Sequence, residues 1–252
     1  MSQILLNGVD TYYIQEGQGK DVICLLGWGQ DSRMFEPTLK HLSDRFRVSI
    51  LDIPGFGKSG LMDEAWSVDD YVLWLKDFIS HHKIENPIFI AHSFGARVAI
   101  KYASQYEVCK MVLTGAAGLK PKHGLDYYAK VYSFKAAKQI FKLPVLNQYK
   151  DDVLKHFGSS DYKSIGGVLK QSFVKIVNED LEPYLSSITA STLLIWGEKD
   201  DATPLWMAKV MEKEMKDAGL VVFENEGHYA YWNQINRFHK IIDNFLKEDA
   251  HG

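Results

Sequence analysis

Three residues that lie far apart in the sequence, Ser93, Asp200 and His228, carry the side chains needed for nucleophilic catalysis. A serine hydroxyl becomes a nucleophile when a histidine removes its proton. A carboxylate holds that histidine in the correct tautomer and stabilises its cation. Such a group cleaves acyl bonds through a covalent acyl-enzyme, provided that the fold brings the three side chains together.

Ser93 lies in PIFIAHSFGARVAI, where an apolar run typical of a strand passes into a helical pattern. One interpretation is a helix N-cap, a frequent role for serine at such a junction. The other is a sharp strand-to-helix elbow that exposes the hydroxyl. An elbow has room only for small residues two positions before and after the serine, here Ala91 and Gly95. Glycine is more usual than Ala91, so this stretch alone leaves both interpretations open.

His228 differs from the other eight histidines because it follows the apolar run LVVF in a short loop, ENEGHYAYW. Loops at the carboxyl ends of parallel strands are where sites form in such sheets. His92 flanks Ser93, but side chains alternate along a strand, so we expect its ring to point away from Ser93. The remaining histidines are expected in amphipathic helices and partly exposed, in a helical insertion, or in the tail: His41, His81, His82, His156, His239, His123 and His251.

The acid is expected at the end of another strand, in STLLIWGEKDDATP. Glu198, Asp200 and Asp201 all lie in this loop, and Pro204 opens the next helix. The spacing favours Asp200 as the partner of His228. The alternative is a solvated loop that ends in a helix N-cap.

Strands and helices alternate on both sides of these residues. QILLNG and TYYIQEG are typical of a hairpin, and DVICLLG, FRVSILD, PIFIAH and VCKMVLTGA follow as strands with helical segments between them. This order predicts an α/β fold with a mostly parallel central sheet and helices on both faces. Residues 119–188 are helical, aromatic and rich in lysine, so they are predicted to form a cap inserted between two core segments, 1–118 and 189–252.

The composition is that of an ordinary globular domain, with 252 residues, 46% hydrophobic residues, 24% charged residues and a net charge of -3. It excludes a disordered chain and carries no basic bias towards nucleic acid. The two cysteines, Cys24 and Cys109, lie in apolar runs and are expected to be buried thiols in a cytoplasmic protein. We see no signal peptide and no membrane span, and the sequence gives no indication of oligomeric state.

Five motifs carry a family resemblance: LLGWGQ, LDIPGFGKSG, AHSFGA, WGEKDDATP and EGHYAYW, in this order. With them the chain resembles the α/β-hydrolase superfamily, in its cap-bearing branch, over about residues 20–118 and 189–247. The resemblance implies a triad in the chain order Ser93, Asp200, His228.

The resemblance also implies an oxyanion hole made by two backbone N–H groups, those of Phe94 and Trp28. Leu26 stands where relatives usually have histidine, which leaves the support of this loop open. The mechanism needs no cofactor. We find no Cys/His cluster with metal spacing and no GxGxxG, and GFGKS lacks a full P-loop.

The leading prediction is a carboxylesterase-like serine hydrolase for a small or medium apolar ester, with Tyr128, Tyr132 and Tyr229 lining its pocket. The second is a carbon–carbon bond hydrolase of the meta-cleavage product type. The stretches Ser-Phe-Gly and His-Tyr-Ala-Tyr-Trp resemble motifs of that family. Those enzymes are expected to hold a dienoate carboxylate with a cap arginine, and residues 119–187 contain none. The third is a ligand-binding signalling protein on the same fold.

Overall fold

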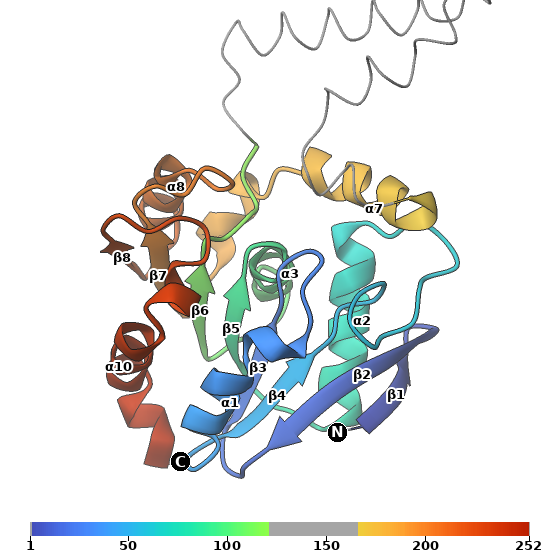
Figure 1. Ribbon diagram of the computed structural model, residues 1–252, viewed down its shortest axis with the longest axis horizontal. Coiled ribbons are helices and arrows are strands. Elements are labelled where there is room, and N and C mark those ends of the chain that lie inside the picture. Colours follow the sequence, from blue (N-terminus) through green and yellow to red (C-terminus); the bar gives the residue numbers. More distant parts are fainter. Residues whose placement is uncertain (1, 121–165, 252) are drawn as a thin grey trace, which may run out of the picture.

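A computed structural model describes residues 2–120 and 166–251, which form one eight-stranded sheet in the order β1-β2-β4-β3-β5-β6-β7-β8 (Figure 1). β1 and β2 form the predicted hairpin, and β2 pairs antiparallel with β4, while all later pairings are parallel. The strands are β1 (Ser2–Leu6), β2 (Val9–Glu16), β3 (Asp21–Leu25), β4 (Arg47–Leu51), β5 (Ile88–His92), β6 (Lys110–Thr114), β7 (Ser191–Gly197) and β8 (Ala218–Phe223).

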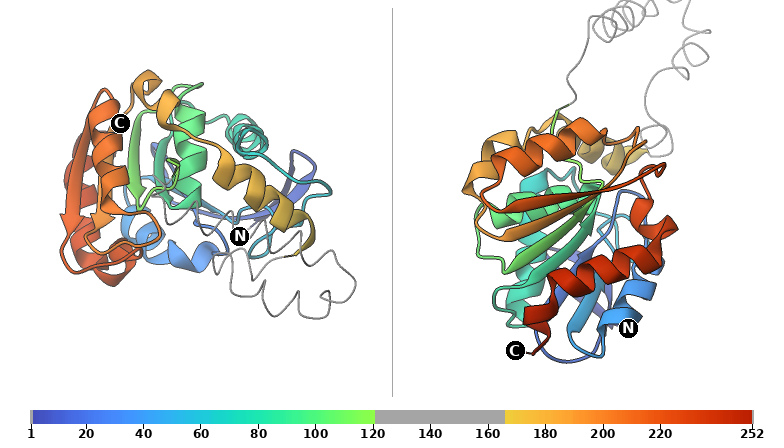
Figure 2. Two further views of the ribbon diagram at one scale, coloured as in Figure 1. Left: turned by 90° about the horizontal axis from the view of Figure 1, so that it is seen from above. Right: turned by 90° about the vertical axis from the view of Figure 1, so that its left-hand side faces the viewer.

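Helices cover both faces of this sheet (Figure 2). They are α1 (Glu36–Leu42) and α10 (Ile235–Phe245) on one face, and α2 (Val68–His81), α3 (Phe94–Ala103) and α8 (Leu205–Glu214) on the other. Every residue of β3 and β5 is buried, as expected for parallel strands covered on both sides. The predicted fold class is confirmed.

Two further segments, α7 (Gly167–Asn178) and the 3₁₀ helix η3 (Glu182–Ser187), follow the undescribed part of the chain. α7 lies above α2, at the end of the molecule towards which the arrowheads of β5 and β6 point (Figure 1). Arg97 of α3 holds its last turn, since Nη1 donates to the carbonyl oxygens of Ile176 and Glu179 at 2.9 and 2.7 Å. A cap over residues 119–188 stays a prediction, because residues 121–165 lie outside the described parts.

The cysteine prediction is half right. Cys24 is fully buried, but Cys109 is only partly buried, because it precedes β6 and lies at the end of the sheet. Its thiol accepts a hydrogen bond from Nζ of Lys20 at 2.8 Å. In the part of the chain that the structure describes, no helix is long and apolar enough to cross a membrane.

Candidate active site

Ser93 stands at the turn between β5 and α3 in a conformation that few residues other than glycine adopt, with φ 51° and ψ -110°. Its side chain makes no capping hydrogen bond to α3, although the residue occupies the N-cap position. The backbone N–H instead donates to the carbonyl oxygen of Thr114 at 3.0 Å, which ties the turn to β6. This is the geometry of the strained elbow rather than of an ordinary cap.

The small residues beside Ser93 have a steric cause. A Cβ at Gly95 would lie 2.3 Å from the carbonyl oxygen of Leu25, so a larger residue would push α3 away from the end of β3. Ala91 is fully buried within β5. The close approach of α3 to β3 therefore requires a residue without a side chain at position 95.

Asp200 and His228 lie in contact at the ends of β7 and β8. Nδ1 of His228 is 2.8 Å from Oδ2 of Asp200. The same carboxylate accepts the backbone N–H groups of Ala202 and Thr203 through Oδ1, at 3.0 and 2.8 Å, and the Thr203 hydroxyl through Oδ2, at 2.9 Å.

These donors decide the charge of Asp200. Burial alone would raise its pKa, but the hydrogen bonds from His228 and Thr203 outweigh burial and hold the pKa below its ordinary value. An ionised carboxylate only accepts hydrogen bonds, so Nδ1 of His228 carries the proton. In the neutral ring, Nε2 then keeps its lone pair and can accept a proton.

The two competing acids of this loop, Glu198 and Asp201, are both exposed. Glu198 accepts the backbone N–H of Asn225 at 3.0 Å, and Asp201 has no contact with the histidine ring among the described interactions. Of the three candidates, Asp200 is the one that the structure brings to His228.

Gly115, which follows β6, is a site residue that the sequence analysis missed. Its φ is +48°, and a Cβ there would lie 3.0 Å from Nδ1 of His228 and 3.1 Å from Oδ2 of Asp200. Only a glycine lets β6 approach the pair this closely. The available signal was a glycine directly after the strand in VLTGA.

The ring of His92 lies against that of His228, with 4.7 Å between centroids. This contact was not predicted from the sequence, and the prediction that the ring points away from Ser93 stays a prediction. Nδ1 of His92 bonds to Oγ1 of Thr114 at 2.9 Å, on the neighbouring strand β6. Burial lowers the pKa of His92 to about 3, so this ring packs beside His228 without adding charge.

The loop after β3 carries the other predicted donor, the N–H of Trp28. Within residues 2–120 and 166–251, neither this N–H nor that of Phe94 donates a hydrogen bond. The side chains of Trp28 and Phe94 meet edge to face, with 5.2 Å between ring centroids. The two residues are thus in side-chain contact, and the oxyanion hole that their N–H groups would form stays a prediction.

Gln30 supplies the support that Leu26 lacks. Its Oε1 accepts the N–H of Gly27 at 2.8 Å, and its own N–H donates to the carbonyl oxygen of Gly27 at 3.2 Å. Leu26 itself is fully buried. A glutamine three residues after Gly27 therefore closes this turn by a local hydrogen bond.

Of the three predicted pocket residues, Tyr128 and Tyr132 lie outside the described residues, and Tyr229 lies beside His228 with 45% of its surface exposed. The loop after β8 is followed at once by a short helix, α9 (Ala230–Asn233), which the sequence analysis did not predict. A cleft of about 400 Å³ lies here, lined by Gln30, Met34, residues 227–229, Trp232 and Asn233.

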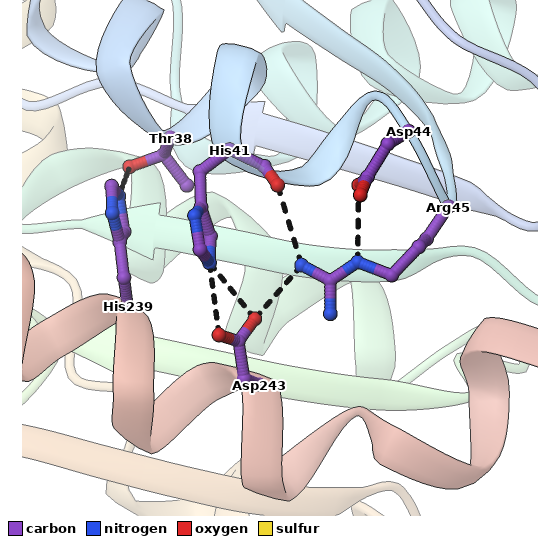
Figure 3. Close-up of polar contacts among 6 residues, drawn as sticks. All are labelled: Thr38, His41, Asp44, Arg45, His239 and Asp243. Atoms are coloured by element: carbon purple, nitrogen blue, oxygen red, sulfur yellow. Dashed lines mark hydrogen bonds and ion pairs between the residues drawn. The ribbon is translucent and has the colours of Figure 1, made fainter.

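A second histidine–aspartate contact joins α1 to α10 (Figure 3). Nε2 of His41 lies 2.9 and 3.0 Å from the two carboxylate oxygens of Asp243, and Nη2 of Arg45 lies 2.9 Å from one of them. The ring of His41 stacks on that of His239 at 4.1 Å. Across the described residues, no three His, Cys, Asp or Glu side chains are placed to hold a metal ion.

A family model described as "Alpha/beta hydrolase family" matches residues 22–238. The chain belongs to this family. It is 27% identical over 259 residues to the AB hydrolase superfamily protein YisY of Bacillus subtilis (strain 168), covering 93% of this chain and 95% of that protein. It is 25% identical over 263 residues to 2-hydroxy-6-oxo-6-phenylhexa-2,4-dienoate hydrolase of Comamonas testosteroni, covering 94% and 91%.

Two solved structures show the same fold as this alpha/beta hydrolase. One is a meta-cleavage product hydrolase from Pseudomonas fluorescens IP01, with a TM-score of 0.75, 24% identity and coverage of 98% of both chains. The other is an esterase from Exiguobacterium antarcticum, with a TM-score of 0.76, 24% identity and coverage of 98% and 99%. Membership of a hydrolase family supports an enzyme with a small-molecule substrate.

Proposed function

We propose that this alpha/beta hydrolase is a serine hydrolase that cleaves a small or medium apolar carboxylic ester through an acyl-enzyme. The strained conformation of Ser93 carries the proposal, because a helix cap has no need of a positive φ. The bond between His228 and Asp200 supports it, since an oriented imidazole is what a serine nucleophile requires.

In this mechanism Nε2 of His228 takes the proton from Oγ of Ser93, and Oγ attacks the carbonyl carbon of the ester. The N–H groups of Trp28 and Phe94 stabilise the oxyanion, and losing one such donor costs about 3–4 kcal/mol of transition-state stabilisation. The imidazolium then protonates the leaving alcohol. Water, deprotonated by the same histidine, attacks the acyl carbon and releases the acid, and Ser93 recovers its proton without a cofactor.

A carbon–carbon bond hydrolase is the second candidate, favoured by the likeness to the dienoate hydrolase of Comamonas testosteroni. Its substrate would bring a carboxylate into the site. Residues 119–187 hold no arginine for that group, and Arg97 already donates Nη1 to two carbonyl oxygens of α7 and the loop after it. We therefore rank ester cleavage first. Turnover of a vinylogous 1,5-diketone acid would reverse the order.

The cap over residues 119–188 and a cytoplasmic location belong to the same proposal. Arg97 and α7 support the first, because Arg97 anchors this helix at the end of the molecule towards which the parallel strands point. Two unpaired cysteines support the second. A ligand-binding protein on this fold is the remaining alternative, which tight binding without appreciable turnover would indicate.

The test is ester turnover by Ser93→Ala, with Ser67→Ala as the matched control. Ser67 is an ordinary cap, because it forms a capping box with Asp70 at the start of α2. We expect Ser93→Ala to lose turnover with its fold intact by circular dichroism. Ser67→Ala should keep turnover and lose about 1 kcal/mol of unfolding free energy. Full activity in Ser93→Ala would refute the proposal.

A further inference from the structure

We propose that the cleft beside His228 is the subsite for the leaving alcohol of the ester, and that it takes a neutral, apolar group such as a benzyl or medium alkyl chain. This inference rests on the proposed ester hydrolysis and names the part of the substrate that the described residues would select. The cleft volume of about 400 Å³ lies within the range of small-molecule sites.

One wall of the cleft adjoins the loop of the proposed oxyanion hole, and the other contains the proposed proton donor. Gln30 and Met34 come from the loop after β3 and from the 3₁₀ helix η1 (Ser32–Met34), and Gln30 holds the turn that contains Trp28. His228 lies in the opposite wall, with Tyr229 and Trp232 after it. The cleft therefore opens between the oxyanion loop and the proton donor.

This position fits the leaving group rather than the acyl group. The leaving oxygen must come within hydrogen-bond reach of the histidine that protonates it, so the alcohol extends on the side of His228. The ring of Trp28 packs against those of Phe56 and Phe173, with 4.8 and 5.3 Å between centroids. None of these three rings is among the lining residues of the cleft, so the aromatic contacts of Trp28 leave the space beside His228 to the alcohol.

The walls are held in place by a buried contact below them. The rings of Phe35 and Tyr231 stack with 5.3 Å between centroids, and both side chains are fully buried. Phe35 follows Met34, and Tyr231 precedes Trp232, so the stack fixes the two walls relative to each other. The subsite is thus formed before substrate arrives, which lowers the entropic cost of binding.

The lining selects a neutral and apolar group. None of the described lining residues is Asp, Glu, Lys or Arg. Two polar lining groups already have partners, since Oε1 of Gln30 accepts from Gly27 and Nδ2 of Asn233 donates to Glu226 at 2.9 Å. Trp232 and Tyr229 keep 40% and 45% of their surfaces exposed, and such aromatic surface binds rings and alkyl chains well.

The experiment compares two series of esters. In one, the acyl group is acetate and the alcohol grows from methyl through hexyl to benzyl; in the other, the alcohol is methyl and the acid grows. Simple alkyl alcohols differ little in acidity, so rate differences in the first series report binding. In the wild type we expect kcat/KM to rise about tenfold or more from methyl to benzyl acetate.

Trp232→Ala should lower kcat/KM for hexyl and benzyl acetate about 10- to 100-fold and leave methyl acetate within about threefold. Met34→Ala, in the opposite wall, should reduce the same preference. Leu5→Ala is the matched control, because Leu5 is an exposed apolar residue of β1 outside the cleft, at 67% exposure. It should change neither series.

The outcomes separate the subsite from the reaction. Ester turnover with no preference for larger alcohols, or equal losses across both series in Trp232→Ala and Met34→Ala, would overturn the subsite alone. A wild type that hydrolyses no ester in either series would overturn the proposed function and the subsite with it.

Discussion

Among residues 2–120 and 166–251, two regions bring a histidine against an aspartate, and the two pairs differ in their surroundings. At the ends of β7 and β8, Nδ1 of His228 meets Asp200 at 2.8 Å. Between α1 and α10, Nε2 of His41 meets Asp243 at 2.9 Å (Figure 3). The distances are nearly equal, so distance alone does not distinguish the pairs.

Burial and the other partners of the carboxylate distinguish them. The side chain of Asp200 is 0% exposed and receives two backbone N–H groups and a hydroxyl besides His228. Asp243 is 33% exposed and shares its charge with the guanidinium of Arg45. A carboxylate with a second cation beside it stabilises an imidazolium less, because part of its charge is already balanced.

The backbone next to each histidine differs as well. His228 lies at the carboxyl edge of the sheet, where the strained turn at Ser93 and the available N–H groups of Trp28 and Phe94 also lie. His41 lies within a helix and stacks on His239. The comparison indicates that the strand ends make the first pair a candidate for catalysis, while the second pair joins two helices.

The largest effect should come from removing one carboxylate charge from each pair. We expect Asp200→Asn to lower kcat for an ester about 10⁴-fold, because the amide no longer holds His228 in the reactive tautomer. Asp243→Asn should leave kcat unchanged and cost about 1 kcal/mol or less of unfolding free energy, since the pair is partly exposed. Steady-state kinetics and urea titrations measure both. Equal loss of kcat in the two variants would contradict the assignment of a catalytic role to the His228–Asp200 pair alone.

A smaller effect is expected from Gly115→Ala. The added methyl group would contact both His228 and Asp200, and the residue would keep a positive φ that disfavours alanine. A displacement of about 1 Å at the pair can cost about 10²-fold in rate. Gly219→Ala is the control, because a Cβ there meets nothing within 4 Å. Wild-type kcat in Gly115→Ala would mean that the pair tolerates this displacement.

The smallest effect concerns stability and pH at the helix pair. Burial, and then the charge of His41, lower the pKa of His239 from 6.5 to about 4. Between these values the unfolded chain binds a proton that the folded chain does not, so the free energy of unfolding falls as the pH falls. We expect His239→Gln to weaken this fall between about pH 6.5 and pH 4.5 in urea titrations.

His81→Gln is the control for that measurement, because His81 is an exposed residue near the end of α2. It should leave the pH dependence as in the wild type. Part of the dependence should remain in His239→Gln, since burial lowers the pKa of His92 to about 3 and acts in the same direction. A wild-type slope in His239→Gln would contradict the assignment.

The residues that could be predicted from sequence are those whose position follows from a strand end. Ser93, Asp200 and His228 stand one, three and five residues after the ends of β5, β7 and β8, and parallel strands bring such ends to one edge. His92 and Gly115 could not be placed this way. Their contacts depend on the register of β5 with β6, in which His92 lies opposite Thr114, and on the twist of the chain at Ser93.

The support of the oxyanion loop was missed for a different reason. The bond from Gly27 to Gln30 is local, but it depends on side-chain direction within an irregular turn, which periodicity does not report. The contact of His41 with Asp243 was missed because it requires two helices from opposite ends of the chain to pack side by side.

The most direct measurement is labelling with a fluorophosphonate, followed by peptide mass spectrometry, on the wild type and on Ser93→Ala. Only an activated serine reacts readily with this probe. We expect one adduct on the peptide that contains Ser93, and none in Ser93→Ala. A folded wild type that takes up no label, or carries it on another serine, would contradict the claim that His228 and Asp200 activate Ser93.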